Sequence, residues 1–340
     1  MNLTLSRPTH VLVTGCAGFI GMHTARHLVT HGLRVTGVDS LDAYYDVALK
    51  EARLRELSGL QGFRFARVDL AEADATAQLF REGDFTHVVH LAAQPGVRYS
   101  LVNPGAYFTN NLTAFGNVIE GCRHARVGHL VYASSSSVYG ANHVLPFSED
   151  QNVDHPVSLY AATKKANELI AYSYSHLYRL PTTGLRFFTV YGPWGRPDTA
   201  PMLFAKAILA GTPIRVFNYG KMRRDFTYVS DIVEGIARLL EKPPAPDDQG
   251  APYVVYNIGN HEAVELETFI AHLERLLGRT AIREGLPMQA GDVPETYAAI
   301  DRLAAATGFT PSTPLTEGLA RFVAWYRDYD KGDYGRKPAD

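Results

Sequence analysis

Short apolar runs alternate with longer amphipathic stretches along the first half of the chain. The first run is His10 to Thr14, which a cluster of glycines ends and an amphipathic segment to His31 follows. A strand-length run followed by helical periodicity predicts a strand, a turn and a helix. Five more apolar runs of strand length follow, with helical stretches between them, at residues 34–38, 63–68, 87–91, 129–133 and 182–187.

Strands that are separated by helices cannot pair as hairpins, so they pair in parallel through right-handed crossovers, with helices on both faces of the sheet. The pattern therefore predicts an α/β fold with a doubly wound (Rossmann) parallel sheet. After Gly192 prolines become frequent and the elements become shorter. We predict a Rossmann domain over residues 1–190 and a smaller C-terminal α/β substrate domain over residues 191–340, with segments near 225–260 packing back on the first domain.

Composition narrows the class of protein without changing the predicted fold. The 340 residues suggest two folding units at about 150 residues each. Lys plus Arg is 33 and Asp plus Glu is 35, a net charge of −2, so nucleic acid and anionic membranes are not expected partners. No window of about 18 apolar residues predicts a membrane span. Cys16 and Cys122 cannot form a disulfide framework, so we expect a cytoplasmic protein, and we predict no metal site.

Glycines between the first predicted strand and helix indicate a dinucleotide site. Without side chains at Gly15, Gly18 and Gly21, the backbone can approach a pyrophosphate, and the helix N-terminus supplies amide donors. Asp39 ends the second strand, where a carboxylate can accept both ribose hydroxyls of the adenosine half and repel a 2′-phosphate. We therefore predict NAD rather than NADP. The alternatives are glycines that serve packing alone and a turn residue at position 39.

Two further strand ends lie at the carboxyl edge of the predicted sheet, where the cofactor should extend. The residues predicted to contact NAD from these turns and strand ends are Gly15, Gly18, Phe19, Ile20, Gly21, Asp39, Asp69, Leu70, Leu91, Ala92, Ala93 and Gln94.

Tyr160 and Lys164 lie one helical turn apart, so both can point from one helix face into the cleft. A phenol with a pKa of about 10 is a poor base at neutral pH, and lowering its pKa to about 7 takes about 4 kcal/mol. One cation at about 6 Å with an effective dielectric constant near 20 supplies about 2.8 kcal/mol. Lys164 alone is therefore insufficient. We expect the positive nicotinamide of NAD+ to supply the remainder.

A run of four serines, Ser134 to Ser137, follows the fifth strand and places hydroxyls beside the expected position of Tyr160. We choose Ser135 as the hydroxyl that hydrogen-bonds the reacting oxygen. A flexible serine loop and a chance surface Tyr/Lys pair are the alternatives. The order of glycine loop, Asp39, serines and Tyr/Lys favours a hydride-transfer site over both.

At these residues the sequence resembles the nucleotide-sugar branch of the extended short-chain dehydrogenase/reductase superfamily, from about His10 to Tyr329. More narrowly, it is similar to the UDP-glucuronate 4-epimerase family. Four segments carry that narrower resemblance, namely residues 42–46 (DAYYD), 94–100 (QPGVRYS), 159–168 (LYAATKKANE) and 186–198 (RFFTVYGPWGRPD).

The resemblance implies roles for individual residues. Its catalytic set is Ser135, Tyr160 and Lys164, and it implies that Tyr160, Lys164 and Asn110 also lie against the cofactor. Its sugar contacts are Ser135, Ser136, Ser137 and Thr189, with Arg224 on the UDP pyrophosphate, Arg196 on the uronate carboxylate and Arg98 on the phosphates. For Arg224 the alternative is a surface cation; for Arg98 and Arg196 it is a structural salt bridge. One departure is Gln289, where many sugar-nucleotide epimerases have a second pyrophosphate arginine.

The expected function is therefore inversion of C4 of UDP-glucuronate to give UDP-galacturonate, through a transient 4-keto intermediate and tightly bound NAD. Decarboxylases of this branch usually carry a Glu directly before the Val-Tyr-Gly segment, whereas this chain has Ser136 and Ser137 there. The alternatives are a UDP-glucuronate decarboxylase, a 4-epimerase of neutral UDP-hexoses, and a sensing or scaffold protein without chemistry. The resemblance also implies a homodimer formed through the predicted helices Pro104–Cys122 and Val157–Tyr178.

Overall fold

The largest sheet of the molecule is parallel throughout and carries helices on both faces. A computed structural model describes residues 9–289 and 291–330, and in that part of the chain the sheet has seven strands in the order β11-β6-β5-β4-β1-β2-β3. The doubly wound prediction is confirmed. The strands are β1 (His10–Thr14), β2 (Arg34–Asp39), β3 (Phe63–Arg67), β4 (His87–His90), β5 (His129–Ser135), β6 (Thr182–Phe187) and β11 (Tyr253–Ile258).

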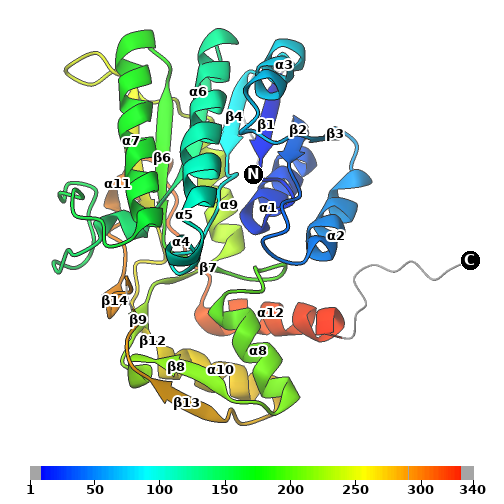
Figure 1. Cartoon of the computed structure of the whole chain (residues 1–340), viewed down its shortest axis with the longest axis vertical. Helices are drawn as coiled ribbons and strands as arrows, with labels where there is room; N and C mark the ends of the chain where they lie inside the picture. Colours follow the sequence, from blue (N-terminus) through cyan, green and yellow to red (C-terminus); the bar gives the residue numbers. More distant parts are fainter. Residues whose placement is uncertain (1–8, 290, 331–340) are drawn as a thin grey trace, which may run out of the picture.

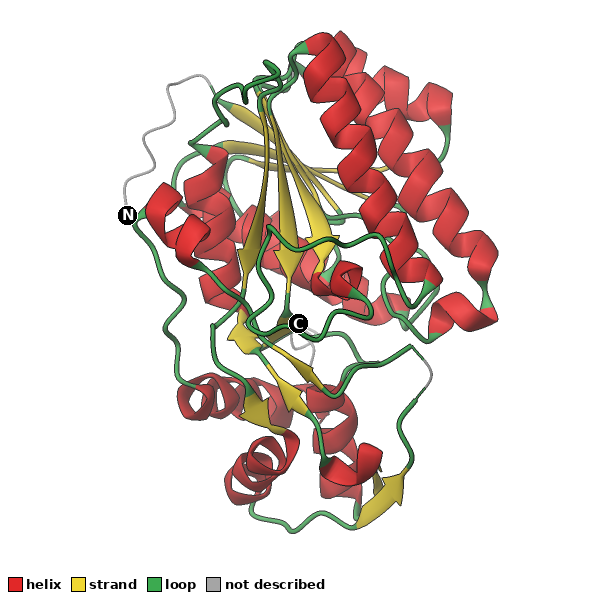
Figure 2. Ribbon diagram, turned by 90° about the vertical axis from the view of Figure 1, so that its left-hand side faces the viewer, coloured by secondary structure: helices red, strands yellow, loops and turns green. Residues whose placement is uncertain are grey.

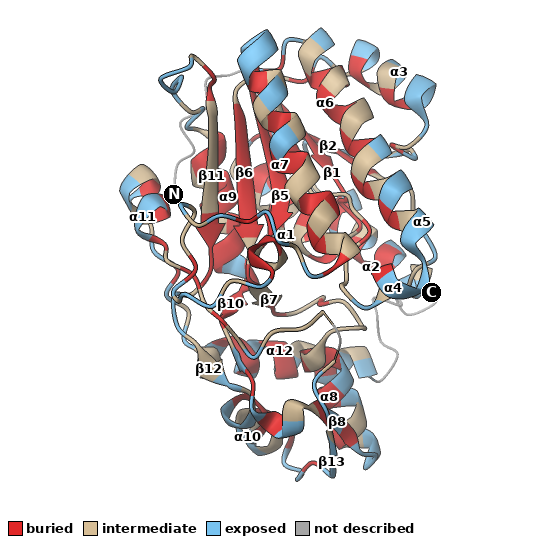
Figure 3. Cartoon of the chain, turned by 60° about the vertical axis from the view of Figure 1, so that its left-hand side comes forward, coloured by how far each residue is buried: buried red, intermediate tan, exposed pale blue. Residues whose placement is uncertain are grey.

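Six of these strands are the six apolar runs of the sequence, with ends that differ by at most two residues. The strand β11 was not predicted, because it follows the proline-rich segment and lies far along the chain from its neighbour. It pairs in parallel with β6, with Tyr253 opposite Thr182 and Ile258 opposite Phe187. In Figure 3 it borders the sheet and is less buried than the red central strands, as expected of an edge strand.

Helices cover the two faces in separate layers (Figures 1 and 2). One face carries α1 (Phe19–Thr30), α2 (Val47–Ser58) and α9 (Val229–Leu240), and the other carries α3 (Ala73–Gly83), α6 (Ala114–His124) and α7 (Leu159–Tyr178).

Alternation of side chains along each strand explains why both faces need a cover. Val11 and Val13 belong to the core beneath α1 and α9, whereas Leu12, between them, belongs to the core beneath α6. All three side chains are completely buried. A strand that is buried on both faces reads as a continuous apolar run, which is the signal found in the sequence.

A smaller group of elements lies beneath the carboxyl edge of the sheet (Figure 1). It consists of α8 (Ala200–Ala210), β8 (Ile214–Phe217), α10 (Leu266–Leu277), β13 (Arg283–Leu286) and α12 (Leu315–Asp330), around a core that includes Phe204, Phe269 and Phe322. The chain enters this group more than once, because α9 packs on α1 and β11 pairs with β6 between α8 and α10.

Shorter elements complete the two parts and the segments between them. They are α4 (Tyr99–Val102), α5 (Pro104–Tyr107), η1 (Phe108–Thr113), η2 (Ser136–Tyr139), β7 (Thr189–Tyr191), η3 (Asn218–Gly220), β9 (Arg223–Arg224), β10 (Phe226–Tyr228), β12 (Val264–Glu265), β14 (Glu295–Thr296) and α11 (Asp301–Thr307). Among all helices in the described ranges, we find none whose length and hydropathy would let it cross a bilayer.

Candidate active site

A cavity opens at the carboxyl edge of the sheet, where β1 and β4 are neighbours and the chain order reverses. Doubly wound sheets bind their ligands at this switch point. The lining contains most of the residues that the sequence predicted: Gly15, Gly18, Phe19, Ile20, Gly21, Asp39, Asp69, Leu70, Leu91, Ala92, Ala93, Gln94, Asn110, Ser135, Tyr160, Lys164, Thr189 and Arg196.

The glycine turn is packed so closely that side chains cannot be accommodated. Gly15 has a φ of +70°, and a Cβ atom there would lie 2.8 Å from the amide nitrogen of Ala92. A Cβ atom on Gly21 would lie 2.0 Å from the carbonyl oxygen of Gly15. The helix α1 begins directly after Gly18, which has no side chain to cap it. Its first amides therefore remain available to an anion in the cavity.

Asp39 lies at the end of β2 and is held by the neighbouring turns. Its Oδ2 atom accepts a hydrogen bond from the amide of Ala17 at 3.1 Å, and its Oδ1 atom accepts one from the amide of Leu41 at 2.9 Å. An ionised carboxylate offers about four acceptor positions, so both oxygens can still accept hydroxyl donors. The turn and ligand interpretations of Asp39 are thus compatible.

Thr14 and His90 fix the backbone that follows β4. The Thr14 Oγ1 atom accepts hydrogen bonds from the amides of Leu91 and Ala92, both at 3.1 Å, and lies 2.8 Å from His90 Nδ1. Burial, assisted by the charge of Lys164, lowers the pKa of His90 to about 3. The imidazole is therefore neutral, and because the Thr14 oxygen already accepts two amide hydrogen bonds, its hydroxyl donates to Nδ1. Sequence reasoning missed this pair, since its two residues lie on different strands.

Ser135, Tyr160 and Lys164 meet where β5 ends beside the start of α7. Ser158 caps α7 by accepting a hydrogen bond from the amide of Ala161 at 3.1 Å. The Lys164 side chain is buried, and its Nζ atom donates to the carbonyl of Ala133 at 2.8 Å. The spacing argument is therefore correct in placing Tyr160 and Lys164 in one cavity.

The charges that act on the pKa of Tyr160 differ from the sequence-based expectation, which gave this role to Lys164 and NAD+. Burial raises the pKa of the phenol, while a hydrogen bond with Ser135 and the positive charge of Arg196 act to lower it. Burial also lowers the pKa of Lys164 to about 8. In the chain without cofactor, the phenol is therefore protonated at neutral pH. Arg196, rather than Lys164, is the protein cation that favours the phenolate, and sequence reasoning did not assign it this effect.

A buried ion pair between Glu168 and Arg186 contacts the serine run at Ser134. Glu168 on α7 accepts a hydrogen bond from the Ser134 hydroxyl at 2.6 Å. Arg186 on β6 binds both oxygens of the same carboxylate, each at 2.9 Å. Both charged side chains are 4 % exposed. This pair joins α7, β5 and β6 directly behind Ser135.

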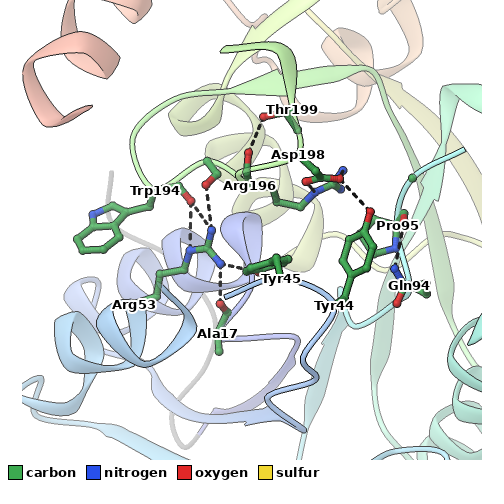
Figure 4. A network of polar contacts seen from close by, with 12 residues as sticks. Ala17, Tyr44, Tyr45, Arg53, Gln94, Pro95, Trp194, Arg196, Asp198 and Thr199 are labelled. Atoms are coloured by element: carbon green, nitrogen blue, oxygen red, sulfur yellow. Dashed lines mark hydrogen bonds and ion pairs between the residues drawn. The ribbon is translucent and has the colours of Figure 1, made fainter. Parts of the chain in front are cut away.

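Arg196, which lines the cavity, forms an ion pair with Asp198 (Figure 4). The Nε and Nη2 atoms of Arg196 lie 3.0 and 3.1 Å from the two oxygens of Asp198. Tyr44 donates its hydroxyl to the same carboxylate at 3.1 Å. Burial and the Asp198 charge raise the pKa of Tyr44 to about 12. Arg196 thus forms the salt bridge and also lines the cavity, and its contact with a substrate carboxylate stays a prediction.

Four predicted site residues lie outside the cavity lining. Ser136 and Ser137 form the start of η2. Arg98 is exposed and stacks over the ring of Phe217, 4.8 Å from its centroid. Arg224 pairs with Asp292 at 2.7 Å. The structure therefore does not bring these side chains to Tyr160 directly.

The segment around Asn110 has a local form that the sequence did not predict. It is a π-helix, η1, inserted before α6. Such turns shift the helical register and occur frequently at functional sites. Asn110 lines the cavity, while Asn111 accepts a hydrogen bond from the amide of Gln94 at 2.7 Å and donates to Thr163 Oγ1 at 3.1 Å. One turn thus supplies a cavity residue and a brace between α7 and the loop after β4.

Other lining residues carried no site prediction. Tyr44 and Tyr45 belong to a segment that supported the family resemblance, and this was the available signal for them. The residues of this kind are Ser40, Asp42, Tyr44, Tyr45, Lys50, Val68, Pro95, Ala114, Ala133, Ser134, Phe187, Phe188, Val190 and Thr199.

These features together define a dinucleotide-dependent enzyme. They are a doubly wound sheet, a glycine turn, an acidic residue at the end of β2, and a Ser/Tyr/Lys group in the same cavity. Residues 11–259 match the NAD dependent epimerase/dehydratase family, and the chain belongs to this family. It is therefore an NAD-dependent enzyme, as predicted.

Individual relatives align over nearly the whole chain. Protein CapI of Staphylococcus aureus is 52% identical over 332 residues, covering 94% of this chain and 99% of that protein. A probable UDP-glucuronate 4-epimerase of Rhizobium meliloti is 48% identical over 327 residues, covering 93% and 96%. The crystal structure of UDP-glucuronic acid 4-epimerase from Bacillus cereus, in complex with UDP-glucuronic acid and NAD, superposes with a TM-score of 0.87 at 32% identity, covering 94% of this chain and 100% of that one. The predicted family resemblance is confirmed.

Proposed function

We propose that this enzyme inverts C4 of UDP-glucuronate to give UDP-galacturonate. The observation that carries the proposal is the position of Arg196. Its guanidinium lines the same cavity as Ser135 and Tyr160, and its positive charge acts to lower the pKa of the Tyr160 phenol. A cation beside the reacting group suits a sugar that carries a carboxylate. The names of the Rhizobium and Bacillus relatives support the same substrate.

The residues at the cofactor end fit NAD. The uncapped start of α1 offers amides to a pyrophosphate, and the Asp39 carboxylate keeps acceptor positions for ribose hydroxyls while disfavouring a 2′-phosphate. Asn110 is proposed to lie near the nicotinamide. When bound, NAD+ supplies the acceptor for the C4 hydride and later returns that hydride.

The chain's own residues manage the proton and the sugar. Tyr160 takes the proton of the 4-hydroxyl, and Ser135 hydrogen-bonds the same oxygen. The hydrogen bond with Ser135 and the charge of Arg196 lower the pKa of Tyr160, and a bound oxidised nicotinamide would add a further positive charge that opposes the effect of burial. Lys164 lies in the same cavity, where it donates to the carbonyl of Ala133. After the sugar turns over, Tyr160 returns the proton while the opposite face of C4 is reduced.

Retention of the carboxylate follows from the charges around it. The 4-keto intermediate is a β-keto acid, which loses carbon dioxide readily when its carboxylate is left without partners. We propose that Arg196 binds the substrate carboxylate, with a hydrogen bond from Thr189 in the same cavity lining. Ser136 and Ser137 lie just outside that lining and carry no negative charge at the position where decarboxylases of this branch usually have a Glu. They favour epimerisation over the decarboxylase alternative.

The UDP moiety is proposed to bind beneath the sheet. Arg224 already forms an ion pair with Asp292, and its planar fork suits phosphate oxygens. Arg98 is a second candidate for the phosphates and lies over Phe217. Gln289 supplies a neutral group where the family resemblance implies a second pyrophosphate arginine, and its buried Oε1 atom has no hydrogen-bond partner among the described residues.

Product identification tests the proposed function. Purified protein incubated with UDP-glucuronate should form UDP-galacturonate, followed by proton NMR, without external reductant. Accumulation of UDP-xylose would instead show a decarboxylase. Arg196→Gln should raise the KM for UDP-glucuronate at least tenfold and leave inhibition by UDP within about threefold, because UDP has no carboxylate. Equal turnover of UDP-glucose and UDP-glucuronate by the wild-type enzyme would favour a neutral-hexose epimerase.

A homodimer through the helix pair α6 and α7 is also proposed. Phe108, Leu169 and Leu177 are more than half exposed on the segment before α6 and on α7, so apolar surface remains after these helices pack on the sheet. Light scattering should give twice the mass of one chain. A Leu169→Glu/Leu177→Glu variant should fold and give the mass of one chain, and a monomeric wild-type protein would contradict the proposal.

We also propose a reducing cytoplasm as the location of the protein. The two buried free cysteines support this proposal.

A further inference from the structure

Arg53 on α2 is a completely buried arginine whose described hydrogen bonds go to neutral groups. Its Nη1 atom donates to the carbonyl of Ala17 at 3.0 Å and to the hydroxyl of Tyr45 at 2.6 Å. Its Nε and Nη2 atoms donate to the carbonyl of Trp194 at 3.1 and 2.7 Å, and Nη2 also reaches the carbonyl of Gly195 at 3.1 Å. Figure 4 shows these bonds radiating from one guanidinium.

The segments that Arg53 joins each belong to the cavity or border it. Ala17 lies in the glycine turn, between Gly15 and Gly18, and Tyr45 lines the cavity. Trp194 and Gly195 directly precede Arg196. One side chain therefore links the cofactor end of the cavity to the loop that carries the proposed carboxylate contact.

The loop before Arg196 has a backbone form that needs support. Trp194 has a φ of +64°, a left-handed conformation that a bulky residue rarely adopts. His23 on α1 lies with Nε2 3.0 Å from the carbonyl of Pro193, and burial lowers the pKa of this histidine to about 4, so the neutral ring donates there. With Arg53 on the next two carbonyls, side chains from α1 and α2 hold three successive residues of the loop.

A buried guanidinium is costly unless its hydrogen bonds are satisfied, and these bonds require its planar fork. Burial lowers the pKa of Arg53, and the hydroxyl of Tyr45 opposes that effect. A lysine ammonium has three donors on one atom and cannot reach Ala17, Trp194 and Gly195 together. The geometry therefore depends on arginine and not only on a positive charge.

We propose that Arg53 is a positioning residue that locks the glycine turn to the 194–196 loop, so that NAD binding and recognition of the substrate carboxylate by Arg196 depend on one side chain. The carboxylate part of this inference rests on the proposed function. The cofactor part rests only on the NAD dependence of the family and on the contact with Ala17.

The first test uses Arg53→Lys in the full-length protein. We expect the Kd for NAD, titrated calorimetrically into cofactor-stripped protein, to rise at least tenfold. The KM for UDP-glucuronate should rise at least tenfold, and the inhibition constant of UDP should stay within about threefold. Arg55→Lys, on the exposed side of the same helix, is the matched control and should change none of these values. A lowered melting temperature with unchanged NAD affinity and unchanged substrate preference would overturn the proposal.

The second test asks whether Arg53 acts through Arg196. If it does, the KM of the Arg53→Lys/Arg196→Gln double variant should equal that of Arg196→Gln within about twofold, because interacting residues do not contribute additively. Multiplying effects would overturn the coupling. If Arg196→Gln alone leaves the KM unchanged, the proposed carboxylate contact is wrong, and the Arg53 inference then fails unless Arg53→Lys still weakens NAD binding.

A milder variant covers the case in which Arg53→Lys does not fold. Tyr45→Phe removes one acceptor of Arg53 and leaves its four carbonyl bonds. We expect NAD affinity and the KM for UDP-glucuronate to worsen together, each by about two- to fivefold. A change in one value without the other contradicts a shared lock.

Discussion

Replacing Asp39 with asparagine tests how the chain selects its cofactor. The carboxylate accepts hydrogen bonds from the amides of Ala17 and Leu41 at the end of β2, one on each oxygen, and asparagine can keep only one of them, because its Nδ2 atom donates. The variant exchanges two charge-assisted hydrogen bonds to the adenosine ribose for neutral ones. Each exchange costs about 1 kcal/mol, and two together correspond to a roughly 30-fold loss of NAD affinity.

The same substitution removes the charge that opposes a 2′-phosphate. Two unit charges about 4 Å apart repel by about 4 kcal/mol at an effective dielectric constant of 20. Loss of this repulsion should improve NADP binding while NAD binding weakens, so the ratio of the two Kd values should change by more than about 100-fold.

Calorimetric titration of cofactor-stripped protein with NAD and with NADP measures this ratio. Asp46→Asn is a matched control, because Asp46 caps α2 through the amide of Ala48, outside the cavity lining, and asparagine caps equally well. An unchanged ratio in Asp39→Asn would refute the reasoning and leave Asp39 as a turn residue only.

Three further predictions concern the reacting end and its support. Tyr160→Phe should lower kcat by about 10²–10⁴ while NAD, measured by absorbance after denaturation, stays bound; near-normal turnover would return the chain to the sensing or scaffold class. Glu168→Gln leaves Arg186 buried without its carboxylate and should cost about 3–5 kcal/mol in urea unfolding, whereas a loss below about 1 kcal/mol would mean that water reaches the pair. Because the pKa of Lys164 is lowered to about 8 from 10.5, the unfolded chain binds more protons between these values. The stability of cofactor-free wild type relative to Lys164→Met should therefore rise between pH 8 and 10.5 by about 3 kcal/mol at most, and a falling difference would show the opposite pKa shift.

Local sequence patterns predicted most of the fold, because each of these patterns is contained in a short run of consecutive residues. The run His10–Thr14 is buried on both faces and reads as apolar throughout. The glycine turn and the Tyr160/Lys164 spacing are equally local. By contrast, β11 joins the sheet through pairing with β6, about 70 residues earlier in the chain. No short-range pattern specifies such a neighbour.

The candidate site was predictable where one segment carries the chemistry and not where distant segments meet. Arg53 is one of several charged residues in the helical segment Val47–Ser58, and its burial becomes apparent only when Trp194 and Gly195 are brought to it. The effect of Arg196 on Tyr160 likewise depends on a loop and on the start of α7, which meet at the cavity. The π-helix before α6 has no residue signature comparable to a glycine turn.

Transfer of label at C4 tests the proposed chemistry most directly. UDP-glucuronate carrying deuterium at C4 should give UDP-galacturonate that retains the deuterium at C4 in ordinary water, because the hydride leaves and returns within one cavity without exchange. Product that has lost the label, or a UDP-pentose formed in its place, would contradict C4 inversion by the Ser135, Tyr160 and Lys164 site.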